Sequence, residues 1–169
     1  MRNGRDALPE PRAETSVVER EVRVEAGPEV VFPYFTDPEK MVRWIGVGAT
    51  LDPRPGGVFC LNTIADYFFA GEYLEVEPPR RVVFTWGYGN FPEEPNPLPP
   101  GSSTVEVELV PDGEATIVRL THRVPAELDA FHAMGWENYL ARLGIAAAGG
   151  DPGPDSFREV LEAMIAASD

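Results

Sequence analysis

Apolar and polar residues alternate along several segments of the chain, and this pattern predicts β-strands. Val105, Val107 and Leu109 alternate with Glu106 and Glu108, which gives one apolar face and one charged face. A period of two residues is typical of a half-buried strand. Similar runs predict strands at residues 17–24, 58–61, 67–76, 81–86, 104–110 and 115–124. Turns and short loops connect most of these runs, so we expect an antiparallel sheet.

Apolar residues spaced three and four apart predict helices. Two short helices should follow the first strand, with Pro28 in the first turn of one and Asp37-Pro38 at the start of the next. A long helix should begin near Pro125 and end at Gly149-Gly150. Its apolar stripe, which would cover the sheet, consists of Leu128, Phe131, His132, Gly135, Trp136, Tyr139, Leu140 and Leu143.

These patterns divide the chain into three parts. Residues 1–15 are rich in Pro, Arg and Glu and predict a flexible tail, whereas residues 16–148 should form one folded domain. Residues 149–169 predict a linker and an amphipathic helix that opens on a capping box at Ser156–Glu159. We expect this helix to pack on its own domain, with a homodimer as the alternative. Its apolar residues are Phe157, Val160, Leu161, Met164 and Ile165.

Composition and charge narrow the class of protein. The chain has 169 residues, of which 43% are hydrophobic, and this suits a single domain with its own core. A net charge of −14 disfavours nucleic acid and anionic membranes as partners. No apolar run approaches the roughly 20 residues of a membrane-spanning helix, and the N-terminus lacks a secretory signal, so we expect a cytoplasmic protein. Cys60 is the single cysteine, which excludes an intramolecular disulfide.

A series of short motifs occurs in a fixed order: Val31-Phe32, Thr36–Glu39 with Trp44, Asp52–Gly57, Gly71–Pro79, Arg81–Trp86, Leu120–His122, and Gly135-Trp136 with Tyr139-Leu140. Together they resemble the START-like, or helix-grip, superfamily, and within it the branch named after the activator of the 90-kDa heat-shock-protein ATPase. The resemblance implies an α+β fold. In it, a curved antiparallel sheet of about six to seven strands wraps around a long C-terminal helix, with two short helices after the first strand.

The resemblance also implies a cavity between the sheet and the long helix. Gly135 interrupts the apolar stripe, where glycine costs about 1 kcal/mol of helix stability relative to alanine, so it indicates either space on the buried face or the close approach of another element. The cavity should lie between Gly135-Trp136 and the strands that carry Phe84, Trp86 and His122, with the proline-rich loop 87–102 over its mouth. The predicted ligand-binding residues are Phe32, Trp44, Phe59, Tyr67, Phe69, Phe84, Trp86, His122, His132, Gly135, Trp136, Tyr139 and Leu140.

His122 and His132 are the candidates for polar groups in this cavity. Each is either a core histidine bonded to its surroundings or a polar anchor and general acid/base. Their spacing does not suit a metal site, and we expect neither a metal nor a cofactor. Ser102 and Ser103 have no partner base that is evident in the sequence.

Three functions remain open at this point. The first is binding, sequestration or transport of a small hydrophobic molecule. The second is an enzyme of the cyclase, aromatase or hydrolase type, which would use His122 or His132 on a hydrophobic, polyketide-like substrate. The third is a protein-interaction module. A co-chaperone role is disfavoured, because only a short polar stretch precedes Ser16.

Overall fold

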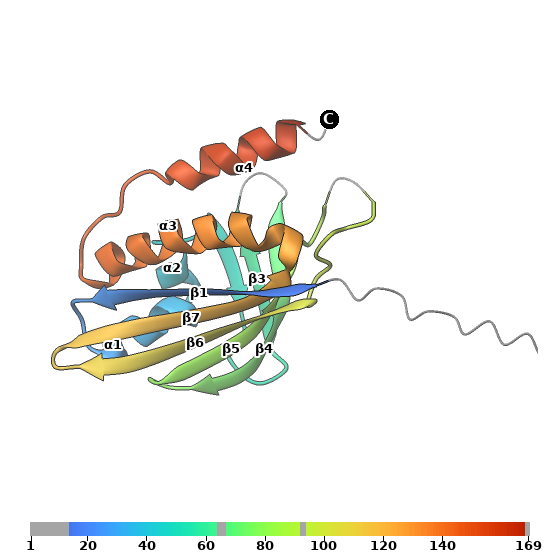
Figure 1. Ribbon diagram of the computed structural model, residues 1–169. Coiled ribbons are helices and arrows are strands. Elements are labelled where there is room, and N and C mark those ends of the chain that lie inside the picture. The colour runs from blue at the N-terminus through green and yellow to red at the C-terminus, as the bar shows by residue number, and fades with distance from the viewer. Residues whose placement is uncertain (1–13, 64–66, 92–93, 168–169) are drawn as a thin grey trace, which may run out of the picture.

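Seven strands form one antiparallel sheet in the computed structural model, which describes residues 14–63, 67–91 and 94–167 (Figure 1). The strands lie side by side in the order β1-β7-β6-β5-β4-β3-β2. Their bounds are β1 Thr15–Val24, β2 Gly48–Leu51, β3 Val58–Asn62, β4 Phe68–Glu77, β5 Arg81–Trp86, β6 Ser103–Asp112 and β7 Ala115–Pro125. Of the predicted N-terminal tail, residues 1–13 lie outside the described residues, and β1 begins at Thr15.

Helices lie on one side of this sheet. The long helix α3 runs along the sheet, and in Figure 1 it lies between the strands β1 and β7 and the last helix, α4. The helical segments are α1 Pro28–Val31, η1 Phe32–Phe35, α2 Pro38–Met41, η2 Ala126–Leu128, α3 Asp129–Ala147 and α4 Ser156–Ala167. The predicted α+β helix-grip fold is therefore confirmed. Within the described residues, no helix combines the length and the apolar character that a membrane crossing requires.

Period-two alternation positions the core, as the sequence predicts. Val105, Val107 and Leu109 of β6 are buried, while Glu108 on the opposite face is exposed. Strand β6 pairs with β7 through a hairpin whose turn contains Gly113 at φ 61°, a conformation that glycine adopts without strain. Buried side chains of the sheet therefore face α3 and fill the space below it.

Gly71 in β4 lies where two strands approach closely. A Cβ atom at this position would lie 2.1 Å from the carbonyl oxygen of Thr85 in β5. The sequence indicated a bulge or bend at Gly71, but the register shift between β4 and β5 lies further along, between Tyr73 and Glu75. Glycine is needed at position 71 because a side chain there would push the two strands apart.

Replacing Gly71 by alanine should therefore lower the free energy of unfolding by about 2–3 kcal/mol, as overpacking does in closed cores. Gly144→Ala in α3 is the matched control, since its new methyl group would lie 3.5 Å from Val22, an ordinary contact. That variant should be neutral or more stable by up to about 1 kcal/mol, because alanine favours helix. Urea unfolding of both variants measures the difference, and equal changes would contradict this account of Gly71.

Candidate functional site

A small apolar cavity lies between α3, the adjoining ends of β4 and β5, and the start of α4. Its volume is about 30 Å³. Six of the predicted ligand-binding residues line it, and four further lining residues come from elsewhere in the chain. The lining consists of Phe69, Trp86, His132, Gly135, Trp136 and Tyr139, together with Ile45, Thr63, Phe131 and Phe157.

Phe157 of α4 occupies the space that Gly135 leaves on the buried face of α3. A Cβ atom at Gly135 would lie 3.4 Å from the ring of Phe157. This ring also packs against Phe131 and Tyr139, with centroid separations of 5.4 and 5.7 Å. Gly135 therefore does create space, as the sequence indicated, but a side chain of the last helix fills much of it.

Polar contacts fix the start of α4 to α3. The Asp155 carboxylate accepts hydrogen bonds from Tyr139 Oη at 2.7 Å and from Asn138 Nδ2 at 3.2 Å. It also accepts one from the backbone N–H of Phe157 at 3.0 Å, so Asp155, rather than the Ser156 of the predicted capping box, caps the helix. Arg142 donates hydrogen bonds to backbone carbonyl groups of the preceding linker, including that of Gly153 at 2.8 Å.

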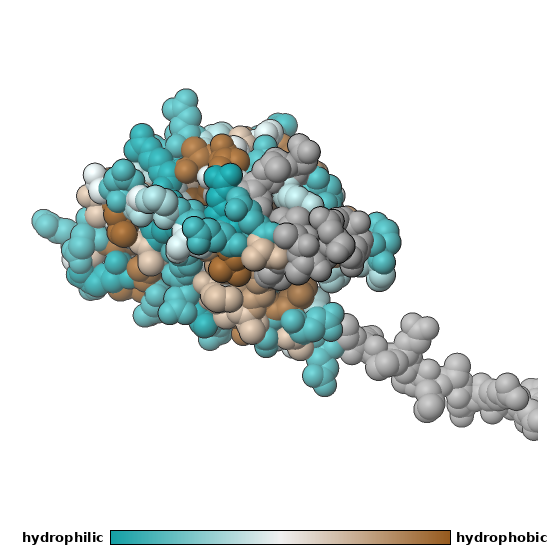
Figure 2. All heavy atoms as spheres, turned by 90° about the horizontal axis from the view of Figure 1, so that it is seen from above, coloured by the Kyte–Doolittle hydropathy of each residue, from teal (hydrophilic) through white to brown (hydrophobic). Residues whose placement is uncertain are grey.

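Beyond Phe157, the α4 side chains that the structure describes are exposed. Phe157 is 6% exposed, whereas Val160, in the next turn, is 37% exposed. The other members of the predicted apolar stripe, Leu161, Met164 and Ile165, have side chains that lie outside the described residues. Figure 2, which views the molecule from above Figure 1, shows a largely hydrophilic surface with small separate apolar patches.

The remaining predicted ligand-binding residues lie away from the cavity wall. Tyr67 is half-buried beside residues 64–66, which lie outside the described residues. Six others are buried in the closed core: Phe32, Trp44, Phe59, Phe84, His122 and Leu140. Phe59 and Phe84, for example, stack on each other with a centroid separation of 4.1 Å.

His122 in β7 has a hydrogen-bond partner at each ring nitrogen. Trp136 Nε1–H donates to Nδ1 at 3.0 Å, and Ser103 Oγ lies 2.8 Å from Nε2. Because Nδ1 accepts a hydrogen bond, the neutral ring carries its proton on Nε2 and donates it to Ser103. Ser103 Oγ then donates to the carbonyl oxygen of Trp86 at 2.7 Å. Burial and, to a smaller extent, the neighbouring His132 lower the pKa of His122 to about 2.

The contact between Ser103 and His122 resembles the nucleophile and base of a hydrolase, but its hydrogen bonds run in the other direction. A serine nucleophile needs a histidine nitrogen that can accept the hydroxyl proton. Here the only lone pair of the neutral ring is taken by Trp136, and the Ser103 hydroxyl proton points to a carbonyl group. This group of residues is a fully paired structural network, and no base activates the serine.

His132 in α3 has one partnered and one unpartnered nitrogen. Its Nδ1–H donates to the carbonyl oxygen of Leu128 at 2.9 Å, which places the lone pair on Nε2. Nε2 is buried and has no hydrogen-bond partner among the described residues, and the same is true of the Trp86 indole N–H. Burial lowers the pKa of His132, against the opposing effect of the hydrogen bond to Leu128, so the ring is neutral at pH 7.

The proline-rich loop 87–102 reaches this region through Tyr88, which is not among the predicted ligand-binding residues. The Tyr88 ring stacks on His132 with a centroid separation of 6.2 Å and an interplanar angle of 18°. Asn96 Nδ2 donates to the Tyr88 carbonyl oxygen at 2.9 Å, and Leu98 of the same loop is buried. The available sequence signal was an aromatic residue two positions beyond Trp86, where the strand ends.

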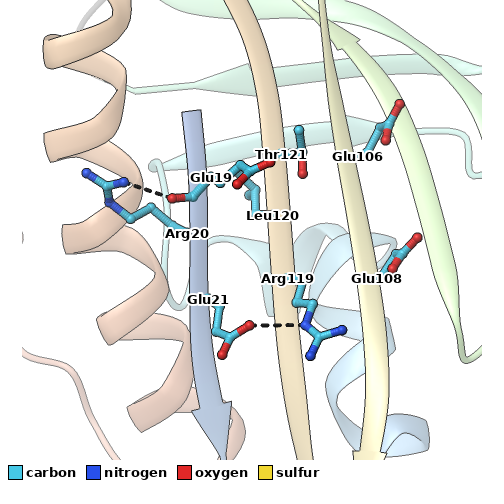
Figure 3. A pocket seen from close by; sticks show the side chains of 8 residues that line it. All are labelled: Glu19, Arg20, Glu21, Glu106, Glu108, Arg119, Leu120 and Thr121. Atoms are coloured by element: carbon cyan, nitrogen blue, oxygen red, sulfur yellow. Dashed lines mark hydrogen bonds and ion pairs between the residues drawn. The ribbon is translucent and has the colours of Figure 1, made fainter. Parts of the chain in front are cut away.

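A larger depression, of about 460 Å³, lies on the opposite face of the sheet (Figure 3). Charged side chains such as Glu19, Glu106 and Glu108 line it, and an ion pair of 3.1 Å joins Arg119 to Glu21. These groups are solvated and do not suit an apolar ligand. No group of three or more histidine, cysteine or acidic side chains in the described part of the chain is arranged to hold a metal ion.

Comparison with known proteins agrees with the fold. The family model for Activator of Hsp90 ATPase homolog 1-like protein matches residues 25–148. A solved AHSA1-like protein from Rhizobium etli is 43% identical with a TM-score of 0.65, over 85% of this chain and 89% of that chain. CalU16 from Micromonospora echinospora is 28% identical with a TM-score of 0.63, over 91% and 96% of the two chains.

DynU16, a protein of the dynemicin biosynthetic locus, is 25% identical with a TM-score of 0.67. The match covers 82% of this chain and 50% of DynU16, so this chain spans about half the length of that relative. No curated protein matches the sequence significantly. The match to the family model over most of the chain confirms the resemblance carried by the sequence motifs, and the chain belongs to the Activator of Hsp90 ATPase homolog 1-like family.

Proposed function

We propose that this protein binds a small, predominantly apolar organic molecule in the cavity between α3, the sheet and α4. The observation that carries the proposal is the way in which the cavity is closed. Phe157 is the one α4 side chain that is buried among those described, and its ring lies in the cavity against Gly135. A bound molecule would take the place of this ring.

The size of the cavity agrees with such an exchange. At about 30 Å³ it holds little more than one water molecule while Phe157 is in place. Withdrawal of the ring would join its volume to the cavity, and apolar cavities of the order of 150 Å³ accept benzene-sized molecules. Aromatic walls from Phe69, Trp86 and Trp136 then offer the apolar lining that is typical of small-molecule sites.

Binding without chemistry is favoured over catalysis by the state of the histidines. Both nitrogens of His122 are engaged, so an acid/base mechanism would depend on His132 alone. Burial lowers the pKa of His132, which makes its ring a weak base. A relative from a biosynthetic locus is consistent with a small organic ligand, although it is twice as long as the region it shares with this chain.

Replacing Phe157 by alanine should strengthen binding of the benzene-sized probe p-xylene, followed by the fluorescence of the lining residues Trp86 and Trp136, by tenfold or more. The probe must displace the Phe157 ring in the natural protein, and burial of a phenylalanine side chain is worth about 1.5–3 kcal/mol. Val160→Ala is the matched control, because Val160 lies in the same helix and is exposed. It should leave the dissociation constant unchanged in a fluorescence titration.

Near-ultraviolet circular dichroism of each variant verifies that the core is intact. Saturable binding that is strengthened by Phe157→Ala alone supports a site beneath α4. The proposal fails if neither the natural protein nor Phe157→Ala binds the probe saturably. It also fails if Val160→Ala strengthens binding as much as Phe157→Ala, since the effect would then come from a general loosening of the helix.

A further inference from the structure

Two buried polar atoms, carried by residues that line the cavity, have no hydrogen-bond partner among the described residues. They are the Trp86 Nε1–H group, a donor, and His132 Nε2, an acceptor. Trp86 is 3% exposed and His132 is 4% exposed, so neither side chain is open to solvent. A buried polar group without a partner costs roughly 1–3 kcal/mol, and native proteins retain few of them. Both side chains line the same cavity, so a ligand that enters in place of the Phe157 ring is a candidate partner for both atoms.

We infer that the ligand of this cavity is a hydroxyl compound, such as a phenol or an alcohol. Its hydroxyl group accepts a hydrogen bond from Trp86 Nε1 and donates one to His132 Nε2. This inference rests on the proposed function, since it names the chemical class of the molecule that the cavity binds.

Both protein groups are held in place before any ligand binds. The Leu128 carbonyl oxygen fixes the His132 tautomer, and the Tyr88 ring stacks on the imidazole. The indole of Trp86 stacks on Phe69 with a centroid separation of 4.2 Å and an interplanar angle of 20°. A donor and an acceptor fixed by packing are preorganised, which favours selective recognition.

Other polar groups fit this pair less well. A carboxylate accepts from Trp86 but has no proton for His132, and its charge would be buried in an apolar site. A ketone leaves His132 Nε2 unpartnered, and an ammonium group leaves the Trp86 N–H unpartnered. Burial lowers the pKa of His132, so the ring does not become a cation that would attract a carboxylate at neutral pH.

Titration of the full chain with p-cresol and with p-xylene tests the inference, because these probes differ by one hydroxyl in place of a methyl group. The indole N–H signals of ¹⁵N-labelled protein report the contact directly. We expect p-cresol to shift the Trp86 N–H signal downfield, as a new hydrogen bond does. The signals of Trp44 and Trp136 are internal controls, because these groups already donate to Tyr34 O and His122 Nδ1.

Affinity provides the second readout. p-Cresol should bind about tenfold more tightly than p-xylene, the sum of two modest hydrogen bonds. Trp86→Phe and His132→Phe each remove one bond and keep an aromatic ring, so each should reduce or abolish this preference while p-xylene still binds. p-Toluate, the carboxylate analogue, should bind more weakly than either probe. Melting temperatures at or above that of the natural protein show that both variants are folded.

The outcomes separate this inference from the proposed function. If p-xylene binds at least as tightly as p-cresol and the Trp86 signal does not move, the hydroxyl assignment is overturned while binding of apolar molecules stands. A preference for p-cresol that survives in both variants also overturns it, since the hydroxyl would then be recognised elsewhere. If neither probe binds the natural protein or Phe157→Ala, the proposed function itself fails.

Discussion

Replacing His122 by alanine should lower the free energy of unfolding by roughly 5 kcal/mol at pH 7.5. Loss of the imidazole ring leaves a cavity in the core, and such cavities lower the free energy of unfolding by about 2–5 kcal/mol. It also leaves the buried Trp136 indole N–H without its acceptor, which costs roughly 1–3 kcal/mol more. Small domains are stable by only about 5–15 kcal/mol, so this variant should lose about a third or more of its stability.

His132→Ala is the matched comparison, because it truncates the second buried histidine. This variant removes a ring that has one unpartnered nitrogen. The free energy of unfolding should therefore fall by clearly less than in His122→Ala, by about 2 kcal/mol. Urea unfolding at pH 7.5 compares the two. Equal losses, or a loss below about 1 kcal/mol for His122→Ala, would contradict a structural role for the Trp136–His122–Ser103 network.

Acid should destabilise the protein well before its carboxylates are protonated. His122 titrates near its ordinary pKa of 6.5 in the unfolded chain, and burial lowers its pKa to about 2 in the folded protein. Between these values the unfolded chain binds one more proton than the folded protein. The contribution of neutral His122 to the free energy of unfolding is therefore complete above pH 6.5. Below pH 6.5 this contribution falls by about 1.4 kcal/mol for each pH unit.

Burial also lowers the pKa of His132, so this residue adds to the loss in the same direction. The groups around the two rings are neutral: Ser103, Trp86, Trp136 and Tyr88. Urea unfolding at pH 7.5 and pH 5.5 should show a loss of at least about 1.4 kcal/mol. The variant His132→Phe should still show the part of this loss that comes from protonation of His122 in the unfolded chain. Unchanged stability at pH 5.5 would show that the histidines are not buried as neutral rings.

The fold followed from the sequence because each local pattern agreed with the others. Alternation in β6 fixed which face of the strand is buried, and hairpin turns such as the one at Gly113 fixed antiparallel pairing. Asp37 caps α2 as predicted, with its side chain accepting from the Glu39 N–H at 2.9 Å. These signals act over a few residues, so a single sequence contains them.

The site depended on contacts between distant residues, which local patterns do not contain. Gly135 indicated space in the helix face, but the Phe157 ring that occupies it comes from a separate helix beyond a linker. The hydrogen-bond directions at His122 depend on Trp136, Ser103 and the Trp86 carbonyl group, which meet only after β5, β6, β7 and α3 have packed. The two candidate histidines meet edge to face, with ring centroids 5.0 Å apart, but His122 belongs to the core network and only His132 lines the cavity.

The central claim is that a small organic molecule binds beneath α4, and intermolecular nuclear Overhauser effects test it most directly. Labelled protein saturated with p-xylene should show contacts from the ligand methyl protons to the Gly135 Hα protons and to the rings of Trp86 and Phe69, which line the cavity. Contacts confined to the charged depression around Glu21 and Arg119, or no contacts at all in either the natural protein or Phe157→Ala, would contradict it.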